Sequence, residues 1–209
     1  MVITPTRTES APATEEPQRR RFTADEYHRM AEAGVFGEDE RVELLDGEIL
    51  TMPPISGSHY WPTGRLNMIL APAVGRGFIV YMQGPVRLFD DSEPEPDLVI
   101  IPAPPPGRTD IPRPADVLLV VEVSVSSLAY DTGRKLKRYA AAGIPDFWVF
   151  DISGERLLVY RDPSGEDYGH KQTFQRGQSV APLSFPALLV SVDEVLGPPK
   201  AQELLTEVE

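Results

Sequence analysis

The most constraining feature of the sequence is the apolar run from Val117 to Val123, in which Glu122 is the only charged residue. A run of this kind is typical of a central strand that is covered on both faces. A helical pattern follows over residues 131–142, and a second apolar run spans residues 147–150. This order predicts one βαβ-like unit. A carboxylate in such a strand is costly to bury unless a cation joins it, so Glu122 needs a partner.

Capping and turn patterns predict the elements around this unit. Thr23 to Glu26 has the pattern of a capping box, and the helix that it starts ends at Gly34. Asp46-Gly47 between apolar-rich runs predicts a two-residue hairpin. The remaining predicted segments are helices at 63–74 and 191–196, two strands in 78–89 broken at 83–85, strands at 98–101 and 156–161, and an exposed proline-rich loop at 102–116. We therefore expect a mixed α/β class and not a regular doubly wound sheet.

The length and composition fit one domain with tails. Residues 1–20 hold few large apolar side chains, so we predict a disordered tail there, a domain over residues 21–197 and a second tail over 198–209. The absence of cysteine excludes disulfides and thiolate zinc sites. No apolar stretch reaches the ~20 residues of a membrane-spanning helix, and the N-terminus lacks a secretory signal pattern. We expect a soluble cytoplasmic protein with no membrane partner.

Two carboxylates are expected to meet at one edge of the sheet. Asp97 directly precedes the strand pattern of residues 98–101, and Glu122 lies at the end of its own run. If these strands are neighbours, the two side chains suit Mg²⁺ or Mn²⁺, which uses one or two protein carboxylates and leaves positions for water and a phosphate oxygen. Lys135 lies four residues before Tyr139 and shares its helical face, so it borders the sheet. Such a set is suited to phosphodiester hydrolysis.

Structural roles compete with functional ones at several candidates. Glu43 fits either a site residue or an ordinary cross-strand partner in the predicted hairpin. Asp97, after a proline, also suits a turn. His59 fits a residue that orients water or binds phosphate, and equally a hydrogen-bonded structural histidine. For Asp131 we prefer a role as the cap of the helix that carries Lys135.

The charge balance opposes a nucleic-acid substrate. The net charge is −12, whereas binding to a phosphate backbone depends on lysine and arginine. The basic residues expected near the site are Arg134, Lys135, Lys137 and Arg138, of which Arg134 and Lys137 are candidates for substrate binding. Four basic residues provide little positive charge for binding duplex DNA, so we predict weak and salt-sensitive binding to DNA. A homodimer would double the basic surface.

Four segments together resemble a known family. They are Glu-Leu-Leu-Asp-Gly-Glu-Ile at 43–49, Pro-Asp-Leu-Val-Ile at 96–100, Val-Val-Glu-Val-Ser at 120–124, and Asp-x-x-x-Lys-Leu-x-x-Tyr-Ala-x-Ala-Gly-Ile-Pro-Asp-Phe-Trp-Val-Phe-Asp at 131–151. In this order they are similar to the Uma2 family of restriction-endonuclease-like proteins, within the PD-(D/E)xK nuclease superfamily. The resemblance covers about residues 22–196.

The resemblance implies a restriction-endonuclease-like core, a mixed sheet flanked by helices. It implies that Glu43 is the N-terminal acid, Asp97 the aspartate of the PD motif and Glu122 the acid of the ExK motif. Ser124 stands at the lysine position of that motif, and the lysine is displaced to Lys135 on the following helix.

These observations lead to a hypothesis with two alternatives. We expect a Mg²⁺-dependent endonuclease that hydrolyses DNA, with Asp97, Glu122 and Glu43 as metal ligands and Lys135 beside the attacking water. The acidic balance and the long loop also fit a catalytically silent module of the same fold that binds proteins. A metal-dependent phosphoesterase for a small substrate is the third possibility.

Overall fold

A six-stranded sheet forms the centre of the computed structural model, which describes residues 18–54 and 56–198. Its strand order is β3-β4-β5-β6-β7-β8, with β5 and β6 parallel and all other neighbours antiparallel. The strands are β3 (Phe78–Met82), β4 (Leu98–Pro102), β5 (Leu119–Ser124), β6 (Asp146–Asp151), β7 (Arg156–Ser164) and β8 (Asp167–Gln175). The mixed α/β class is confirmed, and β5, the following helix and β6 form the predicted βαβ unit.

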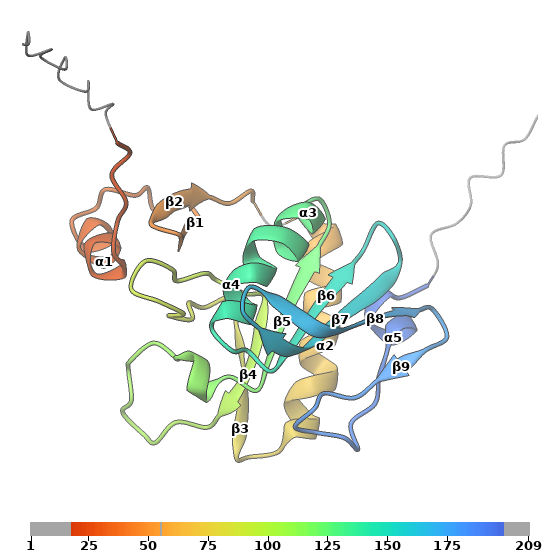
Figure 1. Ribbon diagram of the computed structural model, residues 1–209. Coiled ribbons are helices and arrows are strands. Elements are labelled where there is room, and N and C mark those ends of the chain that lie inside the picture. The colour runs from red at the N-terminus through yellow and green to blue at the C-terminus, as the bar shows by residue number, and fades with distance from the viewer. Residues whose placement is uncertain (1–17, 55, 199–209) are drawn as a thin grey trace, which may run out of the picture.

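Helices cover both faces of this sheet (Figure 1). α2 (Gly57–Val74) and α5 (Val192–Leu196) contribute to one apolar cluster, and α4 (Leu136–Ala141) contributes to the other. Side chains alternate along β5, so Val121 packs in the α2 cluster and Val120 in the α4 cluster. Glu122 therefore shares the face of Val120 and points toward the α4 side.

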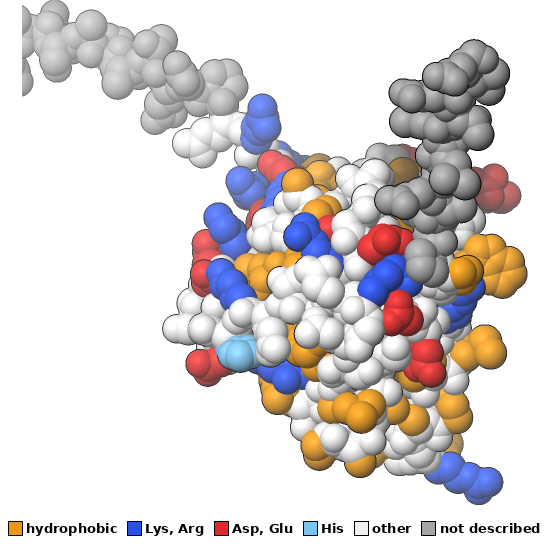
Figure 2. Space-filling model, turned by 90° about the vertical axis from the view of Figure 1, so that its right-hand side faces the viewer, with side chains coloured by type: hydrophobic (Ala, Val, Ile, Leu, Met, Phe, Trp, Pro, Cys, Tyr) orange, Lys and Arg blue, Asp and Glu red, His pale blue; other side chains and the backbone are white. Residues whose placement is uncertain are grey.

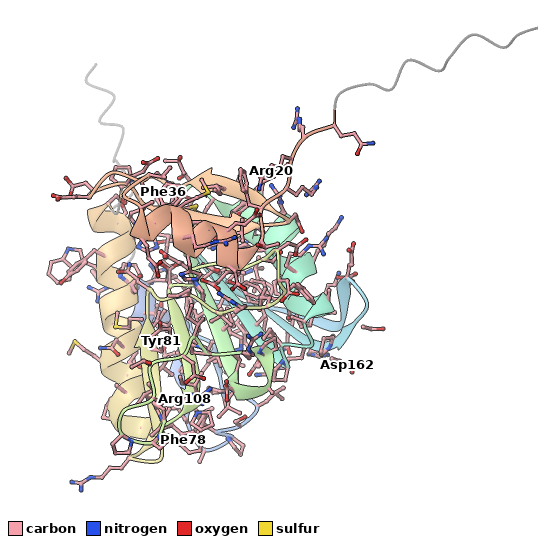
Figure 3. All side chains as sticks on the ribbon, turned by 90° about the vertical axis from the view of Figure 1, so that its left-hand side faces the viewer. Arg20, Phe36, Phe78, Tyr81, Arg108 and Asp162 are labelled. Carbon is pink, nitrogen blue, oxygen red and sulfur yellow. The ribbon has the colours of Figure 1, made fainter. Side chains whose placement is uncertain are left out.

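An N-terminal helix and a hairpin lie at one end of the sheet (Figure 1). The helix is α1 (Ala24–Glu32), and its predicted capping box between Thr23 and Glu26 is present. The hairpin pairs β1 (Val42–Leu45) with β2 (Glu48–Thr51) through Asp46 and Gly47, whose φ angles of 54° and 71° are left-handed. Two left-handed residues are what a two-residue turn with the twist of a hairpin requires. The view in Figure 3 shows α1 lying across the end of the molecule from which α2 begins.

Two predicted elements differ in the structure. The helix predicted over 63–74 begins six residues earlier, and it contains both Pro62 and Pro72. The second strand predicted in 78–89 is wrong, because residues 83–97 form a loop that folds on itself. In this loop the amide of Val86 bonds to the carbonyl of Pro94, and the amide of Leu88 bonds to that of Ser92. The prolines in this loop lack the amides that a strand ladder needs.

The helix predicted over 131–142 is continuous with residues before it. It consists of α3 (Leu128–Tyr130), a π-helical segment (Asp131–Lys135) and α4. The predicted cap at Asp131 is wrong, since this residue lies inside the helix and its carboxylate accepts hydrogen bonds from the hydroxyls of Ser124 and Ser127.

The remaining elements are short. β9 (Ser179–Val180) pairs with β10 (Val190–Ser191), which leads into α5 at the position predicted for the last helix. The predicted strand at 156–161 is part of the longer β7–β8 hairpin. The predicted tails lie almost entirely outside the described residues. Within the described ranges, no helix has the length and apolar character needed to cross a membrane.

Candidate active site

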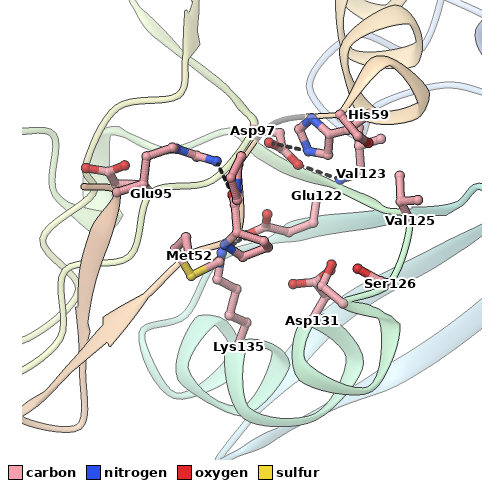
Figure 4. Close-up of a pocket in the computed structure, with 15 residues that line it drawn as sticks. Met52, His59, Glu95, Asp97, Glu122, Val123, Val125, Ser126, Asp131 and Lys135 are labelled. Carbon is pink, nitrogen blue, oxygen red and sulfur yellow. Dashed lines mark hydrogen bonds and ion pairs between the residues drawn. The ribbon is translucent and has the colours of Figure 1, made fainter. Parts of the chain in front are cut away.

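A pocket of about 170 Å³ opens where β4 begins and β5 ends (Figure 4). The ionisable side chains that line it are Arg41, His59, Glu95, Asp97, Glu122, Asp131 and Lys135. The sequence predicts four catalytic residues, and three of them, Asp97, Glu122 and Lys135, line this one cavity. The fourth, Glu43, lies behind it.

Asp97 is held at the start of β4 by two neighbours. One carboxylate oxygen accepts a 2.7 Å hydrogen bond from the amide of Val123 on β5, and the other lies 2.9 Å from Nε2 of His59 in the first turn of α2. The side chain of Asp97 is 9% exposed. The antiparallel pairing of β4 with β5 brings these residues together, because it places Leu98 opposite Val121. Nδ1 of His59 is buried and has no partner within the described ranges.

Glu122 and Lys135 form a buried pair on the other side of the pocket. Nζ of Lys135 donates to Oε1 of Glu122 over 3.0 Å, and the hydroxyl of Tyr139 donates to the same oxygen over 2.7 Å. Burial raises the pKa of Glu122 and also of Tyr139. Burial alone would lower the pKa of Lys135, but the carboxylates of Glu122 and Glu43 outweigh it and raise the pKa of this lysine well above its ordinary value.

Glu43 supports Lys135 from β1. One of its oxygens lies 3.3 Å from Nζ of Lys135 and accepts the amide of Glu95 at 3.0 Å. The other accepts the hydroxyl of Tyr130 at 2.6 Å. Both oxygens are therefore committed to protein donors, and Glu43 does not line the pocket. The ammonium of Lys135 also lies 5.7 Å from the centre of the Tyr130 ring, within reach of a cation–π contact.

The π-helical segment aims Lys135 at the sheet. The amide of Leu136 bonds to the carbonyl of Asp131, five residues earlier, so the turn is wider than in an α-helix. Lys135 ends this wide turn, and its side chain is only 2% exposed. The sequence predicts the face on which Lys135 lies, although the π turn leaves no periodic signal by which it could have been found.

Two predicted substrate-binding residues lie elsewhere. Arg134 donates to the carboxylate of Asp46 at 2.7 Å and pairs with Glu48 at 2.8 Å. Lys137 is exposed on α4, and neither residue lines the pocket. The structure instead adds Arg41 and Glu95, which sequence reasoning missed. Glu95 stands two residues before Asp97 in the same proline-rich segment, and this spacing is a signal in the sequence that could have identified Glu95 as a site residue.

The carboxylate oxygens of the pocket determine whether it can hold a divalent cation. Oε2 of Glu122 accepts no hydrogen bond from the described residues, and each oxygen of Asp97 has one protein partner and retains a lone pair. Two carboxylates suit Mg²⁺, which keeps several waters. Within the described ranges, however, no three histidine, aspartate or glutamate side chains are grouped as a metal site. The arrangement fits a two-carboxylate site, and the contacts of Glu43 fit a partner of Lys135 better than a ligand.

The fold has a known counterpart. It is similar to a structure described as "a putative nuclease belonging to DUF820 from Anabaena variabilis ATCC 29413", with a TM-score of 0.66 and 18% sequence identity. The match covers 84% of this chain and 97% of that chain, so the chain has the fold of this class of α/β protein.

The sequence itself identifies the family. The Uma2 family, described as "Putative restriction endonuclease", matches residues 24–193, and the chain therefore belongs to the Uma2 family. A comparison with curated proteins gives no match.

Proposed function

We propose that this protein is a metal-dependent endonuclease that hydrolyses phosphodiester bonds in DNA. The observation that carries the proposal is the pairing of Asp97 with Glu122 in one pocket, with the buried ammonium of Lys135 3.0 Å from Glu122. Membership of the Uma2 family supports a nuclease in general. The two pocket carboxylates support the metal in this proposal, and the DNA substrate is the finer part of the proposal that cleavage assays test.

Asp97 and Glu122 are the proposed ligands of Mg²⁺ or Mn²⁺. When bound, such an ion supplies a water of lowered pKa and offsets charge on the phosphate. The amide of Val123 and Nε2 of His59 hold the carboxylate of Asp97 in one orientation. Lys135 and Tyr139 fix Oε1 of Glu122, which leaves Oε2 for the pocket. The chain therefore presents two oriented oxygens and does not have to rearrange to do so.

Lys135 acts in this proposal as a fixed cation. Its pKa is raised by Glu122 and Glu43, so it stays protonated and does not serve as the general base. A preorganised ammonium in a water-poor site stabilises negative charge that develops on the phosphate. Glu43 and Tyr130 hold the lysine in place from behind.

Plasmid cleavage tests the proposal. The purified protein is incubated with supercoiled DNA and Mg²⁺ or Mn²⁺, with and without EDTA, alongside Asp97→Asn and Glu122→Gln. We expect cleavage that requires metal and falls by at least about a hundredfold in both variants. Glu32→Gln, an exposed carboxylate on α1, is the matched control and should cleave like the wild type. Activity that survives both pocket substitutions, or that ignores EDTA, contradicts the proposal.

Calorimetric titration with Mn²⁺ separates binding from catalysis. We expect one site in the wild type and none in Asp97→Asn. A protein that binds neither Mn²⁺ nor DNA at low salt would instead support a silent module that acts through protein partners.

A small phosphorylated substrate is the second candidate. The pocket of about 170 Å³ and the net charge of −12 are the two observations that support it. A panel of small phosphomonoesters and phosphodiesters, run beside DNA under the same conditions, separates the two. Turnover of the small esters without cleavage of DNA would replace the endonuclease proposal.

A further inference from the structure

Within the described part of the chain, Lys135 and Arg41 are the only lysine and arginine side chains that line the pocket. Lys135 is deeply buried and already paired with two carboxylates. His59 is engaged with Asp97, so Arg41 is the permanently charged side chain that remains available to a phosphate entering the pocket. Arg134 and Arg138, which the sequence placed near the site, are engaged with Asp46, and Lys137 does not line the pocket.

The hairpin places Arg41 at the pocket. Side chains two residues apart on a strand point to the same face, and Glu43 of β1 reaches Lys135. Arg41 stands two residues before Glu43, and its own carbonyl accepts the amide of Met52 at 2.7 Å, which continues the pairing of β1 with β2. The segment formed by β1 and the residue before it thus places Glu43 behind Lys135 and Arg41 in the lining of the cavity.

The guanidinium of Arg41 is largely uncommitted. Its side chain makes one long hydrogen bond of 3.3 Å to the carbonyl of Pro53, and within the described residues it has no ion pair. A guanidinium carries five N–H donors arranged to bind a phosphate through two parallel bonds. Most of these donors are free, in contrast to Arg134, which contacts Asp46, Glu48 and a carbonyl.

Glu95 lines the same pocket as Arg41. Burial raises the pKa of Glu95, and the positive charge of Arg41 lowers it in part. The two groups therefore interact electrostatically without forming an ion pair. An incoming phosphate can accept two parallel hydrogen bonds from the N–H groups along one edge of the guanidinium.

We propose that Arg41 is the residue that binds a backbone phosphate of the substrate and supplies affinity at the mouth of the pocket. This inference rests on the proposed function, because it takes the substrate to be a nucleic acid. Arg41 acts on a phosphate that does not react, so its contribution is to binding and not to the chemical step.

Oligonucleotide binding tests the inference without requiring cleavage. Fluorescence anisotropy of a labelled DNA duplex is measured with Ca²⁺ over a series of salt concentrations for wild type, Arg41→Ala, Arg41→Lys and Arg76→Ala. Arg76 is exposed on the turn after α2 and does not line the pocket. For Arg41→Ala we expect affinity about tenfold lower and a slope of log affinity against log salt smaller by about one. Arg41→Lys should keep the slope and lose part of the affinity, and Arg76→Ala should match the wild type.

Kinetics with Mg²⁺ provide the second readout. Loss of a uniform binding contact raises KM by about tenfold for Arg41→Ala and leaves kcat nearly unchanged. Thermal unfolding of each variant checks that the fold is retained.

The outcomes separate the two proposals. An unchanged salt slope in a folded Arg41→Ala protein overturns the inference even if DNA is cleaved, and so does a wild type that fails to bind the duplex at low salt. A reduced slope in a protein that never cleaves DNA supports Arg41 and overturns the endonuclease.

Discussion

At the scale of single residues, the stability of the site depends on Lys135. Its ammonium is the shared partner of two buried carboxylates, Glu122 and Glu43. Removal of one member of a buried ion pair leaves uncompensated charge, which typically costs about 3–5 kcal/mol. We therefore predict that Lys135→Met lowers the free energy of unfolding by this amount, measured by urea denaturation at neutral pH.

Lys137 provides the matched control two residues further on. It is exposed on α4, so Lys137→Met should change the free energy of unfolding by no more than about 0.5 kcal/mol. Equal effects of the two substitutions would mean that Lys135 is not held between carboxylates in solution.

The protonation of Lys135 gives a pH prediction. Burial opposes its charge, yet Glu122 and Glu43 raise its pKa well above the ordinary lysine value of ~10.4. A cation whose pKa is raised by folding contributes its full stabilisation below the unfolded-state value and loses it only as the pH rises through the higher folded value. We expect side-chain NMR signals of Lys135 to show no deprotonation up to pH ~10.4. Titration near pH 8 would contradict the ion pairs and reopen a role as general base.

At the scale of elements, a glycine inside the helix of Lys135 and a glycine just after it should respond in opposite ways to substitution by alanine. Gly133 lies in the π-helical segment, and a methyl group added there would meet no atom within 4 Å. Gly143 follows α4 with a φ of 77°, where its amide bonds to the carbonyl of Ala140. We predict that Gly133→Ala stabilises the fold by about 0.5–1 kcal/mol, because alanine is the better helix former. Gly143→Ala should destabilise it by about 1–2 kcal/mol, because the left-handed conformation is strained with a Cβ.

Thermal or urea unfolding of both variants provides the measurement. Cleavage by Gly133→Ala serves as a control, since the substitution adds no contact near Lys135. Loss of stability in Gly133→Ala would indicate that the wide turn requires the conformational freedom of glycine.

Elements with local signals could be predicted from the sequence. The capping box at Thr23 and the turn at Asp46-Gly47 are each set by a few adjacent residues, and both are present. The start of α2 could not be predicted, because its first turn packs beside Asp97 and the helix continues through Pro62, and local propensity carries no information on that packing.

The residues of the site also differ in whether local sequence signals predict their positions. The positions of Asp97 and Glu122 follow from strand ends, and that of Lys135 follows from helical spacing. Arg41 and Tyr130 reach the site only through the docking of the hairpin and the wide helical turn. These are tertiary arrangements that a single sequence does not reveal.

At the scale of the whole molecule, charge limits how a polyanion can approach. The chain carries 32 acidic and 20 basic residues. Figure 2 shows basic and acidic side chains interspersed on the face that it presents, and not one continuous basic patch. Many arginines are also neutralised locally, as Arg87 is by Glu93 and Asp25. Long-range attraction is therefore weak, and local charges at the mouth of the pocket should dominate association.

An acidic loop directly before Arg41 allows the effect of local charge on DNA binding to be tested. Glu38 and Asp39 are exposed, and consecutive Cα atoms are about 3.8 Å apart, so Asp39 lies within ~8 Å of Arg41 along the chain. Their charges should repel an incoming phosphate backbone. We predict that the double variant Glu38→Gln, Asp39→Asn binds duplex DNA several-fold more tightly than the wild type at about 0.01 M salt. The gain should vanish near 1 M salt, where the Debye length falls from ~30 to ~3 Å.

A control of equal net charge separates local from global electrostatics. Glu166 and Asp167 lie at the turn between β7 and β8, in the hairpin that carries Asp162 on the side of the molecule away from α2 (Figure 3). Glu166→Gln with Asp167→Asn removes the same two negative charges. If the position of the charge matters, this control should bind DNA much less tightly than the variant beside Arg41. Equal gains in anisotropy titrations would mean that only the total charge of the molecule governs its approach to DNA, and that the acidic loop has no special role at the pocket.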